Sequence, residues 1–302
     1  MRSGSTWLLR LLCHPCRLEP ADGLGFTLPP DVAAGTRLRA IPVNEFLLGH
    51  HLMPRSGDPI KVDSGHYAPS SVYSFWQSSP DYVLSHEYEE VWRPELRRFV
   101  LTRLHATVER AASRYPIADC APVIIKDVGA SHAARLTLSL LPHSRFLFLT
   151  RDGRDVVDSL FHASQPGGWF ARLAGPVVAN EGNRLAFLRA RAREWACWSD
   201  VCAGAWAEHS PELRRKVRYE DLVADTAFEL GGICEWLGIP RDPETVGAAV
   251  RLNQFGQDEL TGPAEFARAA KPGLWREHFS SREREAVEAE LGPQLERLGY
   301  PV

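Results

Sequence analysis

The first residues of the chain place a cation, a glycine and three hydroxyl groups ahead of an apolar run. The segment reads Arg2-Ser3-Gly4-Ser5-Thr6-Trp7 and continues into Leu8–Leu12. The first backbone N–H groups of a helix have no partner within the helix, and the helix dipole favours negative charge there. The segment therefore predicts a loop that wraps an anion, such as a phosphate, at a helix N-terminus.

A second candidate anion site follows an apolar run in the middle of the chain. Residues 145–150 predict a buried strand, because near-continuous apolar runs of this length suit a parallel sheet that is covered on both faces. Arg151 follows directly, where open α/β sheets bind ligands, and Ser159 lies about two helical turns further on. A guanidinium and a hydroxyl together suit a phosphate. The alternative is that Arg151 pairs only with Asp152 or Asp155 at the strand end.

The elements that must position these residues alternate between strand and helix. Strands are predicted at 39–43, where Pro42 favours an edge, and at 123–125, 145–150 and 217–219. Helices are predicted at 5–13, 87–114 (broken or restarted at Pro94), 130–141, from about 154, 183–208, 225–237, 243–251 and 281–290. This order predicts one α/β domain over residues 1–302, with a doubly wound, mainly parallel sheet of the P-loop type.

Composition and motif counts exclude several classes of protein. The 302 residues carry a net charge of −3, which argues against nucleic acid as a partner, and are 44% hydrophobic, which suits a globular core. No apolar run approaches the ~20 residues of a membrane span and no signal peptide precedes the first motif, so we expect a cytoplasmic protein. Cys13-His14-Pro15-Cys16 has no second Cys-x-x-Cys partner, so no metal or redox site is expected.

The two candidate anion sites together resemble the sulfotransferases that use 3′-phosphoadenosine 5′-phosphosulfate (PAPS), in particular bacterial members and the tyrosylprotein branch. In that family a Pro-Arg-Ser-Gly-Thr-Thr-Trp-like loop binds the 5′-phosphosulfate, and residues 2–7 match it. A strand followed by Arg-Asp-Pro/Gly-Arg, with Ser eight residues after the first Arg, binds the 3′-phosphate; Arg151, Gly153, Arg154 and Ser159 match that pattern.

Two later segments extend the resemblance. Residues 217–222, Val-Arg-Tyr-Glu-Asp-Leu, look like the family's Arg-Tyr-Glu-Asp-Leu segment, and residues 271–276, Lys-Pro-Gly-Leu-Trp-Arg, are similar to its late Lys/Gly/Trp phosphate loop. The resemblance implies that PAPS is the co-substrate, without a metal, and that the donor-binding residues are Arg2, Ser3, Gly4, Ser5, Thr6, Trp7, Arg151, Ser159, Tyr219 and Lys271. Tyr219 would lie on the adenine side, with a buried structural tyrosine as the alternative.

The resemblance also implies the reaction, an in-line transfer of a sulfuryl group to a phenol or to a sugar or alcohol hydroxyl of a small acceptor. Arg2, Lys126 and Glu45 would be the catalytic residues: Arg2 and Lys126 stabilise the sulfuryl group and Glu45 is the base. His50 and His51 are rival bases, and Glu45 could instead cap the following helix. Lys126 could instead pair with Asp127. The irregular residues 53–85 would form an insertion on the acceptor side.

Two rival functions remain open. A P-loop kinase would need Gly-x-x-x-x-Gly-Lys-Ser/Thr, which this loop lacks. A non-catalytic scaffold that binds PAP, the desulfated product, is favoured by an incomplete fold, because family members carry a core strand immediately before the first loop. We therefore predict that Met1 is an internal methionine of a longer protein. The acceptor's identity and a homodimer are left open.

Overall fold

The structure of the protein is a computed structural model that describes most of the chain. The described residues are 4–16, 18, 26–28, 36–44, 81–127, 131–168, 171, 181–240, 242–253 and 271–302. Five candidate site residues lie outside them: Arg2, Ser3, Glu45, His50 and His51. The part of the predicted acceptor-side insertion up to residue 80 also lies outside the described residues.

The strands form two parallel pairs in the described part of the chain. β1 (Ile41–Asn44) pairs with β2 (Val123–Lys126), and β3 (Phe146–Thr150) pairs with β4 (Arg214–Arg218). The pairs are two separate two-stranded sheets in place of the single sheet expected. The predicted strand at 217–219 is wrong in its bounds, because β4 begins at Arg214 and Tyr219 already starts a helix. Apolar runs could not reveal a strand that reads Arg-Arg-Lys-Val-Arg.

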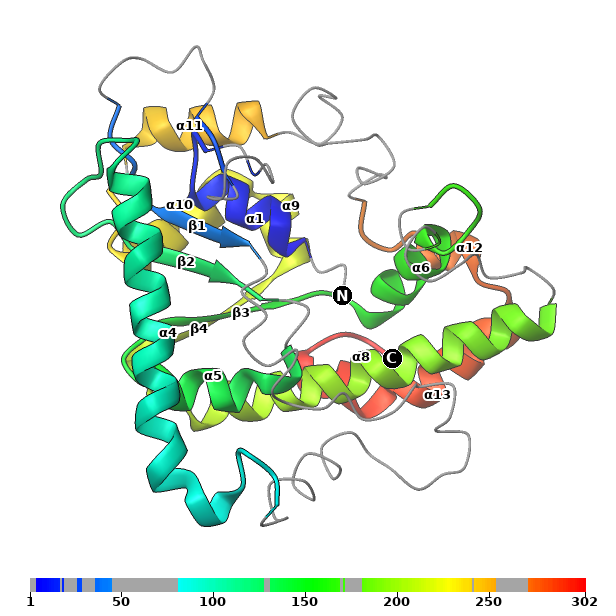
Figure 1. Cartoon of the computed structure of the whole chain (residues 1–302). Helices are drawn as coiled ribbons and strands as arrows, with labels where there is room; N and C mark the ends of the chain where they lie inside the picture. The colour runs from blue at the N-terminus through cyan, green and yellow to red at the C-terminus, as the bar shows by residue number, and fades with distance from the viewer. Residues whose placement is uncertain are drawn as a thin grey trace.

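Helices cover both faces of the strands (Figure 1). Above the strands in this view lie α1 (Ser5–Leu12), α9 (Tyr219–Ala224), α10 (Thr226–Leu237) and α11 (Pro243–Leu252). Below them lie α5 (Ala134–Leu140), α8 (Glu181–Glu208) and α13 (Ser281–Leu298). The long α4 (Glu89–Ala112) runs along one side, while α6 (Gly153–Ala163) and α12 (Trp275–His278) lie beyond the carboxyl ends of the strands. Short 3₁₀ turns occupy His86–Tyr88, Ser131–Ala133 and Pro211–Leu213. The α/β class is confirmed.

Two prolines lie inside helices that continue through them. α4 is unbroken at Pro94, which corrects the predicted break, and α13 continues past 290 through Pro293 to Leu298. A proline inside a helix removes one backbone hydrogen bond, which long helices with many other bonds tolerate. No helix among the described residues is long and apolar enough to cross a membrane.

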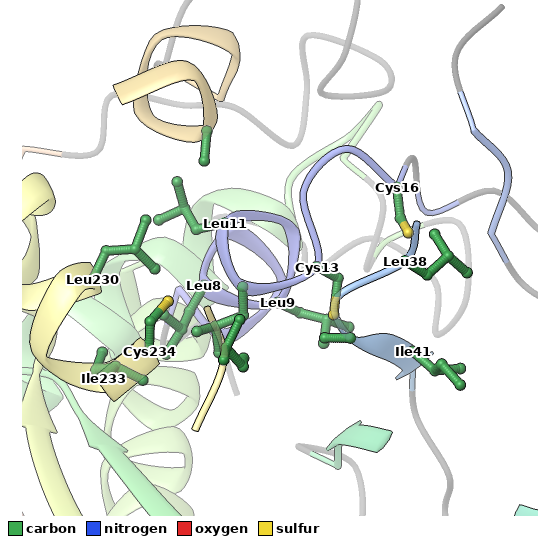
Figure 2. Packing of buried hydrophobic residues seen from close by; sticks show 14 of the residues in the cluster. Leu8, Leu9, Leu11, Cys13, Cys16, Leu38, Ile41, Leu230, Ile233 and Cys234 are labelled. Carbon is green, nitrogen blue, oxygen red and sulfur yellow. The ribbon is translucent and has the colours of Figure 1, made fainter. Parts of the chain in front are cut away.

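α1 is held in place by its apolar residues. Leu8, Leu9, Leu11 and Leu12 are all buried in one hydrophobic cluster. Figure 2 shows Leu11 lying toward Leu230 of α10, and Cys16 lying next to Leu38 just ahead of β1. Helix α1 therefore packs between α10 and the β1–β2 pair, and this packing fixes the position of its N-terminus.

The buried thiols of the Cys-x-x-Cys segment belong to the same cluster. Cys13 and Cys16 are free and buried, and Cys13 lies at the C-terminal cap of α1 as expected. Burial raises the pKa of both thiols, that of Cys16 to about 12. Since the thiolate is the reactive and metal-binding form, this environment disfavours redox or metal chemistry at these two residues.

Candidate functional site

The glycine of the first loop sits at the start of α1 in a conformation that suits glycine. Gly4 is the N-cap of α1 and has a left-handed backbone, with φ of 83°. A Cβ added there would lie 2.4 Å from two ring carbons of Tyr219, closer than atoms can approach. Backbone conformation and contact therefore both require glycine at the start of α1, where the first-turn N–H groups have no partner within the helix.

The ring of Tyr219 joins the two anion-site segments. Tyr219 is only 2% exposed. Trp7 packs edge-on against it, with ring centroids 6.2 Å apart, and donates its indole N–H to the carbonyl of Asn253 at 2.9 Å. The Arg151 guanidinium lies over the same ring, with Cζ 4.5 Å from the centroid. Gly4, Trp7 and Arg151 thus meet on one aromatic ring, although they come from opposite ends of the first half of the chain.

The backbone on either side of Arg151 is fixed by a buried polar network. Glu220 accepts hydrogen bonds from the Asp152 backbone N–H and from the Tyr300 hydroxyl, both at 2.9 Å. Tyr300 also reaches the Thr150 hydroxyl at 3.4 Å. Burial, followed by the Glu220 charge, raises the pKa of Tyr300 well above its usual value, so it remains a donor. This network therefore restricts the backbone conformation at Arg151.

The second arginine of the Arg-Asp-Gly-Arg segment has a structural role. Arg154 is buried and binds both carboxylate oxygens of Asp152, Glu288 of α13, and the Pro301 carbonyl. Asp152 is therefore engaged by Arg154, which leaves Asp155 as the acid that interacts with Arg151. The glycine between them is required by packing, since a Cβ on Gly153 would lie 2.8 Å from the Trp195 ring.

Asp155 ties the late phosphate-loop segment to the start of α6. Its carboxylate accepts hydrogen bonds from the backbone N–H of Gly273 at 2.7 Å and of Trp275 at 3.4 Å. Burial raises the pKa of Asp155, while these bonds and the Arg151 charge oppose the rise. The structure thus brings residues 271–275 to the helix that follows Arg151. Lys271 itself is 70% exposed there, with Nζ 3.7 Å from a Glu277 oxygen.

The remaining predicted residues lie on neighbouring elements. Ser159 is half-buried in the middle of α6. Lys126 ends β2 and donates a hydrogen bond to the Asn44 side chain at 2.9 Å, which is the residue paired with it on β1. Since Asn44 immediately precedes Glu45 in the chain, the segment that carries the predicted base starts beside Lys126.

Three residues that organise the site were not predicted in that role: Asp155 was considered only as a partner of Arg151, Glu220 only as part of the segment 217–222, and Tyr300 not at all. Asp155 lies in the first turn of α6, and its position next to the Arg-Asp-Gly-Arg segment was a usable signal. Glu220 follows Tyr219 in a recognised segment, but its partner Tyr300 is 80 residues away in the chain, and no local pattern signals such a contact.

A cavity of about 640 Å³ lies between the two strand pairs. All residues of β2 and β3 line it. Because alternate side chains of a strand point to opposite faces, a cavity on one face of a sheet would contact every second residue. Contact with consecutive residues means that the cavity meets the hydrogen-bonding edges of β2 and β3. Leu9 of α1 lines it from one side and Trp195 of α8 from the other.

Comparison with known proteins defines the class. The family model described as "Sulfotransferase family" matches residues 1–243, most of the chain. The chain therefore belongs to the sulfotransferase family, which confirms the predicted family and enzyme class.

Individual relatives are distant. Sulfotransferase 2A2 of Mus musculus is 24% identical over 224 residues, which cover 62% of this chain and 73% of that protein. Sulfotransferase 2B1 of Homo sapiens is 26% identical over 175 residues, which cover 50% of this chain and 44% of that protein.

Similar solved structures include other sulfotransferases. The sulfotransferase domain from the curacin biosynthetic pathway is 17% identical with a TM-score of 0.45, and the match covers 100% of this chain and 95% of that one. Mouse sulfotransferase SULT7A1, complexed with PAP, is 16% identical with a TM-score of 0.44, and the match covers 58% of this chain and 66% of that one.

Proposed function

We propose that the protein transfers a sulfuryl group from PAPS to a hydroxyl of a small-molecule acceptor. The observation that carries this proposal is the meeting of Gly4, Trp7 and Arg151 on the ring of Tyr219. The Tyr219 ring links the N-terminus of α1, where a phosphate would bind, to the Arg151 guanidinium at the carboxyl end of β3. A donor with phosphates at both its 5′ and 3′ ends needs two such anion sites across one crevice.

The residues present fit such a donor. The first-turn N–H groups of α1, with the hydroxyls of Ser5 and Thr6, would hold the 5′-phosphate, and Arg2 and Ser3 belong to the same loop. Arg151 and Ser159 would hold the 3′-phosphate. The loop that Asp155 anchors would bring Lys271 to the same end of α6. Tyr219, buried beneath these groups, would act as the rigid surface that orients Arg151.

In sulfuryl transfer the protein contributes mainly by positioning the two reactants and by stabilising negative charge, and less by forming covalent bonds. The proposed donor supplies the sulfuryl group and a phosphate leaving group. Arg2 and Lys126 would stabilise the negative charge on the sulfuryl oxygens, and Glu45 would accept the proton of the acceptor hydroxyl.

Arg151→Met is expected to weaken PAP binding by about 10- to 100-fold, the value of a hydrogen bond to a charged group. Binding of adenosine 5′-phosphate, which lacks the 3′-phosphate, is expected to change by less than about threefold, since Arg151 would not contact it. Isothermal titration of both nucleotides checks this.

Arg214→Met is the matched control, because Arg214 also stacks on an aromatic ring, that of Trp206, with Cζ 4.3 Å from the centroid. It should leave both affinities unchanged. An equal loss of both nucleotides in Arg151→Met would mean that Arg151 only supports the fold.

We also propose that the cavity between β2 and β3 is a site for an additional β-strand. Such a strand would pair with the edges of β2 and β3 that pair with no strand in the described part of the chain, under Leu9 and over Trp195. Ser5 lines the cavity together with Lys126 and Arg151, which mark the carboxyl ends of the two strands. A strand parallel to β2 and β3 would therefore end near the start of α1.

Adding about seven apolar, β-branched residues ahead of residue 1 is expected to raise the free energy of unfolding by about 2–5 kcal/mol, the burial of a few apolar side chains less their ordering cost. A Gly/Ser extension of equal length is the control and should give no gain. Urea denaturation measures stability, and amide hydrogen exchange should show protection in the apolar extension. Equal stability and no protection would refute the strand, and would favour the non-catalytic scaffold.

A further inference from the structure

Three metal-binding side chains converge on the outer part of α6, away from the thiols considered above. Asp158 and His162 are four residues apart on α6 and therefore lie on one face of the helix. His278 reaches them from the end of α12. The ligand atoms of the three side chains all lie within 4.8 Å of one another. No residue of this cluster has a role in the proposed sulfuryl transfer.

The contacts inside the cluster are not those of a satisfied hydrogen-bond network. His278 Nδ1 lies 2.9 Å from Asp158 Oδ2, a normal hydrogen bond. His162 Nε2 lies 3.3 Å from Asp158 Oδ1, and neither of these buried atoms has a well-formed hydrogen bond to any residue that the structure describes. The Asp158 side chain is only 7% exposed. A buried carboxylate oxygen and an imidazole nitrogen therefore face each other at 3.3 Å without a well-formed hydrogen bond, and a shared ion would bind both atoms.

The separations suit one shared ion. Zinc binds histidine nitrogen at about 2.0–2.1 Å and carboxylate oxygen at about 2.0–2.2 Å, so two ligands of one tetrahedral ion lie roughly 3.3 Å apart. The two histidine–carboxylate separations, 2.9 and 3.3 Å, are close to that value. The two imidazoles, whose ring centroids are 4.9 Å apart in an edge-to-face arrangement, have ligand atoms within 4.8 Å of each other and must move closer to share one ion.

The types of the three donor groups point the same way. A divalent ion takes neutral imidazoles and an ionised carboxylate together, which is the donor set that zinc and cobalt prefer.

We propose that Asp158, His162 and His278 bind a divalent transition-metal ion of the zinc type, with water completing its coordination. The ion fastens α12 to α6. Because α12 begins at Trp275, whose backbone N–H already bonds to Asp155, the ion and Asp155 hold the two ends of this short helix against α6. The metal site is structural: it steadies the segment that carries Lys271 and takes no part in transfer.

Cobalt(II) titration of the chelator-treated protein tests the proposal without any nucleotide. We expect one ion per chain, visible d–d absorption typical of tetrahedral coordination, displacement by zinc, and a higher melting temperature with zinc. His162→Gln and His278→Gln should each weaken cobalt binding by tenfold or more, the size of effect that even indirect ligand support has in metal sites.

The matched control is His105→Gln. His105 Nε2 lies 3.2 Å from Glu109 Oε1 in the same four-residue spacing on α4, and no third ligand completes that pair among the residues that the structure describes. This variant should bind cobalt as the parent does. Circular dichroism and PAP binding show whether each variant folds. If one of the two histidine variants does not fold, cobalt binding by the other tests the metal site. No absorption in the parent protein, or equal cobalt binding in all variants, would overturn the site and leave the proposed transfer untouched.

Discussion

Gly4→Ala is expected to remove measurable PAP binding and to destabilise the protein. Alanine at φ of 83° costs about 1–2 kcal/mol of backbone strain. Its Cβ would also lie 2.4 Å from the Tyr219 ring, and displacing a buried ring costs about 1–3 kcal/mol more. Moving that ring disturbs Trp7 and Arg151 together, because both pack on it. Both proposed phosphate sites are therefore lost at once.

Gly299→Ala separates the effect of backbone strain from the effect of the contact with the Tyr219 ring. Gly299 has almost the same backbone angle, φ of 84°, at the end of α13, but nothing lies within 4 Å of the position its Cβ would take. This control should lose about 1–2 kcal/mol of stability by urea denaturation and keep its PAP affinity. If Gly4→Ala binds PAP as well as Gly299→Ala does, the contact with Tyr219 does not organise the donor site.

Glu45→Gln is expected to lower the rate of sulfuryl transfer by about 10²- to 10⁴-fold, the usual contribution of a general base. PAP affinity should stay within about twofold, because the substitution keeps the size of the side chain and touches no proposed donor contact. Single-turnover transfer from labelled PAPS to a simple phenol measures the first quantity, and isothermal titration measures the second.

His50→Gln and His51→Gln decide between the rival bases. Each should retain transfer if Glu45 is the base. Retained transfer in Glu45→Gln, with loss in one histidine variant, would reassign the role. Loss of PAP affinity in Glu45→Gln would instead show that Glu45 supports the fold of the donor site.

The parts of the fold that sequence could predict are those with a strong local pattern. The run of leucines after Gly4 predicted α1, and the apolar runs at 123–125 and 145–150 predicted the strands that the structure has as β2 and β3. Both strands were expected to be buried, but every residue of β2 and three of the five in β3 are only partly buried. The position of β4 was predicted wrongly because four of its five residues are cations, which do not form an apolar run. Partly exposed positions of a strand accept such residues.

The candidate site was predictable residue by residue but not as an arrangement. The types of residue at Gly4, Arg151 and Tyr219 suggested phosphate chemistry, yet nothing local indicated that all three meet on one ring. Tyr300 lies at the end of the chain and reaches Glu220 and Thr150 only through the path of α13. The approach of His278 to Asp158 has the same cause, since α12 returns to α6 across 120 residues of sequence.

One titration series that compares the affinities of the unmodified chain for PAP, ATP and adenosine 5′-phosphate shows whether the chain has two anion sites for a single nucleotide. PAP presents phosphates to both proposed anion sites, whereas adenosine 5′-phosphate can fill only the first and ATP extends its charge away from Arg151. We expect PAP to bind at least about tenfold more tightly than ATP or adenosine 5′-phosphate, which is the effect of one hydrogen bond to a charged group. Preferential binding of ATP, with little or no binding of PAP, would contradict it.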